Sequence, residues 1–250
     1  MLVLKKGSVL KVRYLMKFKK GSDIKFVAHL DIMRAIQRTF KRAQLPVDYS
    51  NGFNPHMKLS IAQPLSVGMY SVGEYLDIDF KEEVDKKDII QRFNSSSTEN
   101  LELLDVIAIK EPYDKDGKKI PQAMAAVDRA TYEIRIKYEN TDSVQEQLLN
   151  LLKESEWNII KKTKNGEKET NIRSMIKEFK FKIEDRVLHI ETLVCCGSRE
   201  NLSAELLSKY IKVHTDNVDE MAFTDIKRTE IYGMNGKKLL PLCEYFKIFA

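Results

Sequence analysis

The sequence has little cysteine, and none of it in a spacing typical of metal sites. Its three cysteines are Cys195, Cys196 and Cys243, and two of them are adjacent. Neighbours on a strand point to opposite faces, so this set does not suit a disulfide framework. No C-x-x-C is present, which disfavours a zinc ribbon or an iron–sulfur cluster held by this chain alone. We expect three small buried side chains in a reducing compartment.

Long apolar runs and the common catalytic motifs are also absent. No stretch approaches the roughly 18 uninterrupted apolar residues of a membrane-spanning helix. The first residues lack the apolar core of about 7–15 residues that a secretory signal needs. Neither a phosphate-binding glycine loop nor G-x-S-x-G nor H-E-x-x-H occurs. We therefore expect a cytoplasmic protein with no membrane partner, no cofactor and no bound metal.

Positive charge is concentrated near the N-terminus. The whole chain has a formal net charge of +5. Residues 1–50 hold eight Lys and four Arg against three Asp, a net charge of +9, which leaves −4 for the other 200 residues. Such segregation favours a surface that faces a polyanion, and nucleic acid is the commonest polyanion of the cytosol. A basic face that contacts only water is the alternative.

Apolar periodicity over residues 11–110 predicts the order βαββαβ, the ferredoxin-like arrangement. Ile32, Ile36 and Phe40 recur at helical spacing, and Leu45-Pro46 ends that helix. The expected strands are 11–19, 58–62, 74–80 and 101–110, and the expected helices are 28–44 and 85–94.

Residues 111–130 are typical of a linker, and residues 131–250 then repeat the same order of elements as a diverged second copy. The expected extended segments are 131–138, 157–164, 170–173, 175–183, 186–195 and 223–232, and the expected helices are 142–154 and 202–213. Glu184-Asp185 is the expected hairpin turn, and Asn201 or Ser203 the expected cap of the last helix. The apolar tail 237–250 is expected to pack back on the protein. The predicted fold class is α+β, with two tandem ferredoxin-like domains, 11–110 and 131–250.

The helix expected at 28–44 carries cations along one face. At 100° per residue its basic side chains lie within about 100° of one another, opposite Ile36. Asp31, in the first turn, is its one acidic residue. The four cations are Arg34, Arg38, Lys41 and Arg42. We expect them to contact the phosphate backbone of RNA or another acidic partner, and a solvated face is the alternative.

The segment Tyr49-Ser-Asn-Gly-Phe-Asn-Pro-His-Met-Lys58 combines turn residues with aromatics and cations. Its candidate RNA-binding residues are Tyr49, Phe53, Asn54, His56 and Lys58. The two aromatic rings are suited to stacking on bases, while the imidazole and the ammonium are suited to phosphate. In the alternative interpretation this is a structural loop, in which Phe53 fills the core and His56 binds the backbone.

A polar pocket is the third candidate site. We expect His29 and His56 to line one concave patch together with Asp31, with Phe53 partly buried as its floor. Residues i and i+2 of a helix do not face each other, so His29 and Asp31 form no dyad by themselves. Their alternative role is capping and packing. Elsewhere, Asp77 and Asp79 share one strand face, where edge-strand solubility is a commoner role than cation binding.

Six stretches of the chain carry a family resemblance, all within residues 11–80. They are Lys25-Phe-Val-Ala-His-Leu-Asp-Ile-Met-Arg34, Phe40-Lys-Arg-Ala43, Leu45-Pro46, Tyr49-Ser-Asn-Gly-Phe-Asn-Pro-His56, Gln63-Pro-Leu-Ser-Val-Gly68 and Glu74-Tyr-Leu-Asp77. Together they closely resemble the radical-SAM-linked protein family, a bacterial domain of unknown function that occurs alone or fused behind a B12-binding radical SAM protein. The likeness implies a radical SAM partner, although the C-x-x-x-C-x-x-C run of that chemistry is missing here. Ala28 departs from the usual Ser of the family and supplies no hydroxyl at the helix start.

A weaker likeness, of architecture and basic helix, is to the CRISPR repeat-processing endoribonucleases, whose glycine-rich C-terminal loop is missing here. The function that we expect is an RNA-binding accessory module in RNA processing or modification, working with a radical SAM enzyme. Its RNA would be a tRNA or an rRNA, and no DNA specificity is implied. One alternative is a nuclease or transferase with a site of His29, Asp31 and His56. The other is a protein-interaction module that docks a radical SAM partner.

Overall fold

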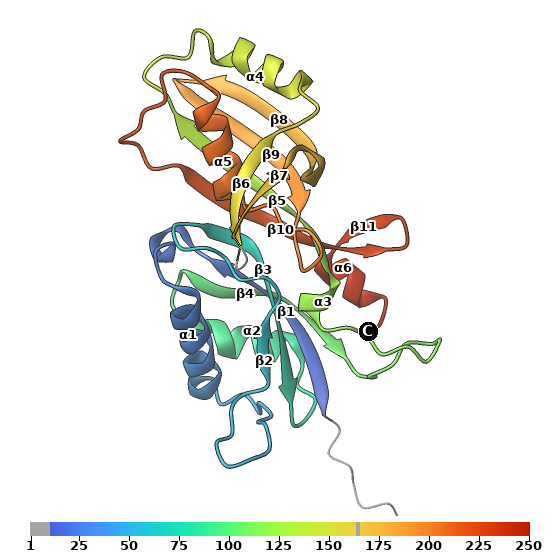
Figure 1. Ribbon diagram of the computed structural model, residues 1–250. Helices are drawn as coiled ribbons and strands as arrows, with labels where there is room; N and C mark the ends of the chain where they lie inside the picture. Colours follow the sequence, from blue (N-terminus) through green and yellow to red (C-terminus); the bar gives the residue numbers. More distant parts are fainter. Residues whose placement is uncertain (1–10, 164–165) are drawn as a thin grey trace, which may run out of the picture. The chain divides into compact units, whose positions relative to one another are not determined.

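The computed structural model describes residues 11–163 and 166–250 (Figure 1). The described residues form two compact units of mixed α+β structure with mostly antiparallel strands. Unit 1 comprises the described residues up to Val127 together with Tyr232–Ala250, and unit 2 comprises Asp128–Ile231. The C-terminal residues therefore group with unit 1, and not with the second half of the chain as the predicted domain 131–250 had them. No helix among the described residues is long and apolar enough to cross a membrane.

Unit 1 follows the order of elements predicted for residues 11–110. Its elements are β1 (Val12–Lys20), η1 (Ser22–Ile24), α1 (His29–Arg42), β2 (Leu59–Ile61), β3 (Tyr70–Phe80), α2 (Lys86–Ser95), β4 (Leu101–Ile109), α3 (Ala123–Ala126), β11 (Lys238–Pro241) and α6 (Leu242–Lys247). The strands lie in the order β4-β1-β3, and β2 also pairs with β3. All three pairings are antiparallel. The predicted linker 111–130 is partly structured, because it contains α3 and the start of the next strand.

One face of this sheet packs against α1 and α2. Alternate residues of β1, such as Tyr14 and Met16, join Ile36 and Phe40 of α1 and Phe93 of α2 in one core cluster. The helical spacing of the apolar residues of α1 therefore decides which side of the helix is buried. The opposite side, which carries the cations, is left to solvent.

The other face of the sheet is covered by α3 and α6. The guanidinium of Arg13, which alternates with Tyr14 on β1, lies 5.9 Å from the ring centroid of Phe246 in α6. Asp77 of β3 accepts a 2.7 Å hydrogen bond from the backbone N–H of Ala123 in α3. The apolar tail predicted to pack back thus does so on unit 1, where α6 contacts β1 and β4.

Unit 2 repeats a similar order with an added ribbon. Its elements are β5 (Val127–Lys137), α4 (Val144–Lys153), β6 (Asn158–Thr163), β7 (Gly166–Asn171), η2 (Arg173–Met175), β8 (Ile176–Glu184), β9 (Val187–Cys195), α5 (Ala204–Val213) and β10 (Asp225–Asn235), which continues into unit 1. The strand order is β10-β5-β9-β8, and β6 and β7 form a separate two-stranded sheet. The β8–β9 turn lies at Asp185-Arg186, one residue later than the predicted Glu184-Asp185. Both turn residues have positive φ, as a type I′ turn requires. Ser203 caps α5, one of the two caps expected, and the three cysteines of the chain are buried.

Candidate nucleic-acid interface

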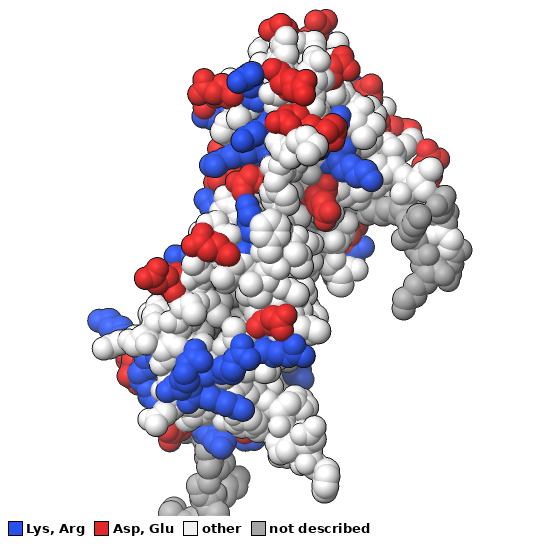
Figure 2. All heavy atoms as spheres, turned by 90° about the vertical axis from the view of Figure 1, so that its left-hand side faces the viewer, with Lys and Arg blue, Asp and Glu red and all other residues white. Residues whose placement is uncertain are grey.

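The exposed side of α1 carries Arg34, Arg38, Lys41 and Arg42, which we call the basic face. All four residues are exposed. Figure 2 shows Lys and Arg side chains gathered over this part of unit 1. The helix starts after Ala28, whose methyl side chain makes no capping hydrogen bond. The four cations lie on one side of the helix, as predicted. They differ in whether their side chains already have hydrogen-bond or ion-pair partners within the protein.

Two members of the basic face have no partner among the residues that the structure describes. Arg34 donates to the carboxylate of Asp31, one turn earlier, at 2.9 Å. The side chains of Arg38 and Lys41, in contrast, form no hydrogen bond or ion pair within the described parts of the chain. An exposed ion pair of the Asp31–Arg34 type contributes less than about 1 kcal/mol to stability. Arg34 can therefore exchange Asp31 for a phosphate at little cost. Arg38 and Lys41 are the cations most available to a polyanion.

Arg42 takes part in a reciprocal capping of two helices. Its Nε and Nη2 donate to the carbonyl of Ser96, just after α2, at 3.1 and 2.7 Å. In return, Arg92 of α2 donates to the carbonyl of Ala43, just after α1, at 3.0 and 2.8 Å. Cations that bind the last carbonyls of a helix stabilise its C-terminus. The structure therefore gives Arg42 a role inside the protein, and it identifies Arg92, which the sequence pattern does not mark.

Replacing Arg42 by alanine should lower the free energy of unfolding by about 1–2 kcal/mol, because charged hydrogen bonds to two carbonyl lone pairs are lost. The matched change Lys41→Ala, on the same face but without a described partner, should stay within about 0.5 kcal/mol. Urea denaturation followed by circular dichroism measures both. Equal stabilities of the two variants would contradict the capping role of Arg42.

The loop between Ser50 and His56 is closed by hydrogen bonds across its base. The Ser50 N–H donates to the His56 carbonyl at 2.8 Å, and the His56 N–H donates to the Ser50 hydroxyl oxygen at 3.1 Å. The Ser50 hydroxyl also lies 2.8 Å from Nδ1 of His56. His56 therefore ties the loop to itself, although its imidazole contacts the Ser50 hydroxyl and not the backbone that the alternative interpretation names. Tyr49 is half-buried and packs against the core of unit 1.

Phe53 and Asn54 stand in solvent at the tip of this loop. The relative exposure of Phe53 is 108%, the value of a fully extended residue. Two predictions for Phe53 are therefore wrong. It does not fill the core, as in the structural-loop interpretation, and it is not the partly buried floor of a shared pocket. Local sequence pattern does not determine which way a loop side chain points, and here Gly52, just before Phe53, has a φ of 126°, which favours glycine.

Lys58 is held at the foot of the same loop. Its ammonium lies 2.7 Å from the carboxylate of Asp48, which Lys11 also approaches at 2.9 Å. The hydrogen bond from Lys58 is the main reason that the pKa of Asp48 falls to about 2. Two ammonium groups share the carboxylate of Asp48, and Asp79 interacts electrostatically with the same lysines, so cations and carboxylates alternate at the foot of the loop.

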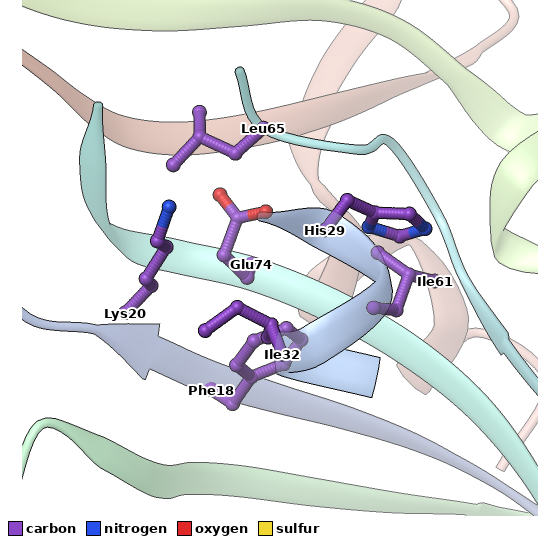
Figure 3. A pocket seen from close by; sticks show the side chains of 7 residues that line it. All are labelled: Phe18, Lys20, His29, Ile32, Ile61, Leu65 and Glu74. Carbon is purple, nitrogen blue, oxygen red and sulfur yellow. The ribbon is translucent and has the colours of Figure 1, made fainter. Parts of the chain in front are cut away.

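His29 lines a small pocket together with residues other than those predicted. Figure 3 shows its lining from α1, β1, β3 and the segment around β2. The lining residues are Phe18, Lys20, His29, Ile32, Ile61, Leu65 and Glu74. Asp31 and His56 are not among them, so the predicted set His29, Asp31 and His56 does not line this pocket.

The pocket offers about 10 Å³, close to the minimum that a single water molecule needs. Lys20 and Glu74 are buried and His29 is half-buried, and the Lys20 ammonium donates to the carbonyls of Lys25 and Val27 at 3.0 and 3.2 Å. These bonds fix the segment that leads into α1. In the described parts of the chain, no three His, Cys, Asp or Glu side chains are placed to hold a metal ion.

The chain was compared with protein-family models, with curated proteins and with solved structures. A family model described as "Uncharacterized protein conserved in bacteria (DUF2344)" matches residues 13–204. The chain belongs to this family. The DUF2344 match starts in β1 and ends at the first residue of α5, so it covers most of both units. Among curated proteins, none matches the chain.

Two solved structures are similar to this DUF2344 chain only at a low level. One is the crystal structure of an unknown protein from Galdieria sulphuraria, with 12% identity, a TM-score of 0.25, and coverage of 87% of this chain and 97% of that one. The other is described as a candidate glycine cleavage system transcriptional repressor, with 11% identity, a TM-score of 0.21, and coverage of 82% and 91%. At these TM-scores neither structure bears on fold or function.

Proposed function

We propose that the chain binds RNA through the basic face of α1, as an accessory module in RNA processing or modification. The observation that carries the proposal is the state of Arg38 and Lys41, which are exposed and have no described partner. A helix that served only as a solvated surface would normally pair such cations with Glu one turn away. A guanidinium and an ammonium left unneutralised on one face are suited to consecutive phosphates.

The arrangement of strands supports a finer description of the fold. With β5, β8, β9 and β10 counted as strands one to four, both units have the order 4-1-3-2. We propose that they are two tandem ferredoxin-like domains, the second with the β6–β7 ribbon inserted. Some domains of this topology bind RNA on the open face of the sheet. In unit 1 that face is covered by α3 and α6, so we place the RNA on the helical side.

A radical SAM protein is the partner that the family resemblance implies, and one observation favours docking of a protein as a second candidate function. Phe26, Leu30 and Val67 are exposed apolar residues with relative exposures of 61%, 61% and 55%. The Gly68 N–H donates to the carbonyl of Lys25 at 2.8 Å, which brings the segments of Phe26 and Val67 together. Contiguous apolar groups of this kind are typical of protein contacts.

Changing Arg38 and Lys41 together to Glu should abolish most RNA binding while the fold stays intact, because both side chains point away from the core. We expect the slope of log affinity against log salt to become shallower by about 0.7–0.9 for each lost phosphate contact. Filter binding of a labelled tRNA over a salt series measures this. Lys180→Glu with Lys209→Glu is the matched control, since both lysines are exposed in unit 2 and the charge change is the same.

Unchanged affinity of the folded Arg38/Lys41 variant would exclude the basic face as the RNA footprint. An equal loss in the control would show that only net charge matters. Binding of wild-type protein with little salt dependence, and with an acidic protein as an effective competitor, would favour the docking candidate over RNA.

A further inference from the structure

We propose that the loop Ser50–His56 presents Phe53 as a stacking surface for an unpaired base. The RNA that this chain binds would then carry an unpaired nucleotide beside the backbone segment held by the basic face. The inference rests on the proposed RNA binding and adds to it a class of RNA: a stem with a bulge or a loop rather than an uninterrupted duplex.

The loop is closed at its base, and Phe53 stands exposed at its tip. Ser50 and His56 are joined by two backbone-directed hydrogen bonds and a side-chain contact, and a bridge between Tyr49 and Met57 closes the base below them. Met57 is buried and anchors the returning strand. The phenyl ring at the tip of this loop is fully exposed, which leaves both of its faces for a ligand.

The chemistry of the tip is suited to a base rather than to a phosphate or an acidic peptide. Residues 50–57 contain no Asp, Glu, Lys or Arg. The exposed amides of Asn51 and Asn54 flank Phe53, and amides donate to and accept from the edges of bases. Aromatic rings stack on every base because each base has a π-face. Charge begins again only at the foot of the loop, where Lys11 and Lys58 share Asp48.

The position of the loop links it to the basic face. In Figure 1 the loop projects from unit 1 beyond the end of α1 that carries Lys41 and Arg42. One RNA can therefore place its backbone along α1 and an adjoining base at the tip. A regular duplex offers no free base face, because its bases are stacked on one another.

The test compares two fluorescein-labelled RNAs that share one stem, one fully paired and one with a single unpaired adenosine. Phe53→Ala should weaken binding of the bulged RNA by roughly 5- to 100-fold and leave the paired RNA unchanged, as expected for loss of one base–aromatic stack. Phe53→Trp should restore the preference for the bulged RNA. Phe53→Leu, which keeps an apolar side chain without an aromatic face, should not.

Equal affinity of wild-type protein for the two RNAs, or no effect of Phe53→Ala on the bulged RNA, would overturn the stacking role while salt-dependent binding through α1 still stands. Full binding of the bulged RNA by Phe53→Leu would also overturn it, since apolar contact alone would then suffice, as in protein docking. A wild-type protein that binds neither RNA would overturn the proposed function itself, and with it this inference.

Discussion

Replacing Phe40 by alanine should destabilise the protein by about 3–5 kcal/mol, the usual range for removing a buried phenyl ring. Phe40 is 0% exposed in the core of unit 1. Its ring centroid lies 4.9 Å from that of Phe93 in α2 and 6.2 Å from that of Phe80 in β3. The substitution therefore opens a cavity at the point where α1, α2 and the sheet meet.

Urea denaturation with fluorescence and circular dichroism as independent probes measures this loss. Phe53→Ala is the matched control, since it removes the same ring from a fully exposed position and should change stability by no more than about 0.5 kcal/mol. A loss below about 1.5 kcal/mol for Phe40→Ala would mean that the three aromatic rings do not form the packed centre of unit 1.

The stability of the protein should also depend on pH through Asp77. Burial raises the pKa of this carboxyl to about 6, against the opposing effects of the Ala123 N–H and of Arg13, whose Nε lies 3.8 Å away. Between about pH 4 and pH 6 the unfolded chain has released this proton while the folded protein keeps it. Folding therefore binds a proton in this window, and the Asp77 contribution to stability falls as the pH rises. The loss is on the order of 3 kcal/mol over the window.

Asp77→Asn removes this titration and keeps an oxygen that accepts from Ala123. The difference in unfolding free energy, variant minus wild type, should therefore increase between pH 4 and pH 6. Denaturation at four or five pH values in the window provides the comparison, with Asp116→Asn at an exposed position as the control. A difference that stays constant with pH would show that Asp77 ionises normally in the folded protein. Asp48 contributes to stability with the opposite pH dependence, and its contribution is lost only as the pH falls toward 2. Because Asp48 is present in both proteins, its contribution cancels in the difference between variant and wild type.

Those features of unit 1 that depend on local periodicity could be predicted from the sequence. Ile32, Ile36 and Phe40 recur at helical spacing and are all buried, and the same repeat places the cations on the exposed side. The order of strands and helices follows from equally local signals, such as the alternation in β1. Each of these predictions needs only residues within about one turn or one strand of one another.

The hydrogen-bond partners and the burial of single side chains could not be predicted in the same way. Arg42 binds a carbonyl 54 positions away in the chain, and Asp77 accepts from a backbone N–H 46 positions away. Asp77 and Asp79 alternate as an edge strand does, yet β3 has β1 and β2 as neighbours. Asp77 is therefore buried beneath α3 rather than placed for solubility. The Asp31–Arg34 ion pair, in contrast, joins residues at i and i+3 of one helix, a spacing that is visible in the sequence.

Unit 1 is assembled from two segments that are separated in the chain by the whole of unit 2. During synthesis at about 5–20 residues per second, the ribosome needs roughly 5–20 seconds to make Asp128–Ile231 before the closing segment emerges. Throughout that interval the strands β1 and β4 lack α6, whose Leu242 and Phe246 are both 0% exposed in the finished protein. The first unit to begin is thus the last to be completed. Until that segment emerges, the part of the sheet face that α6 covers is left to solvent.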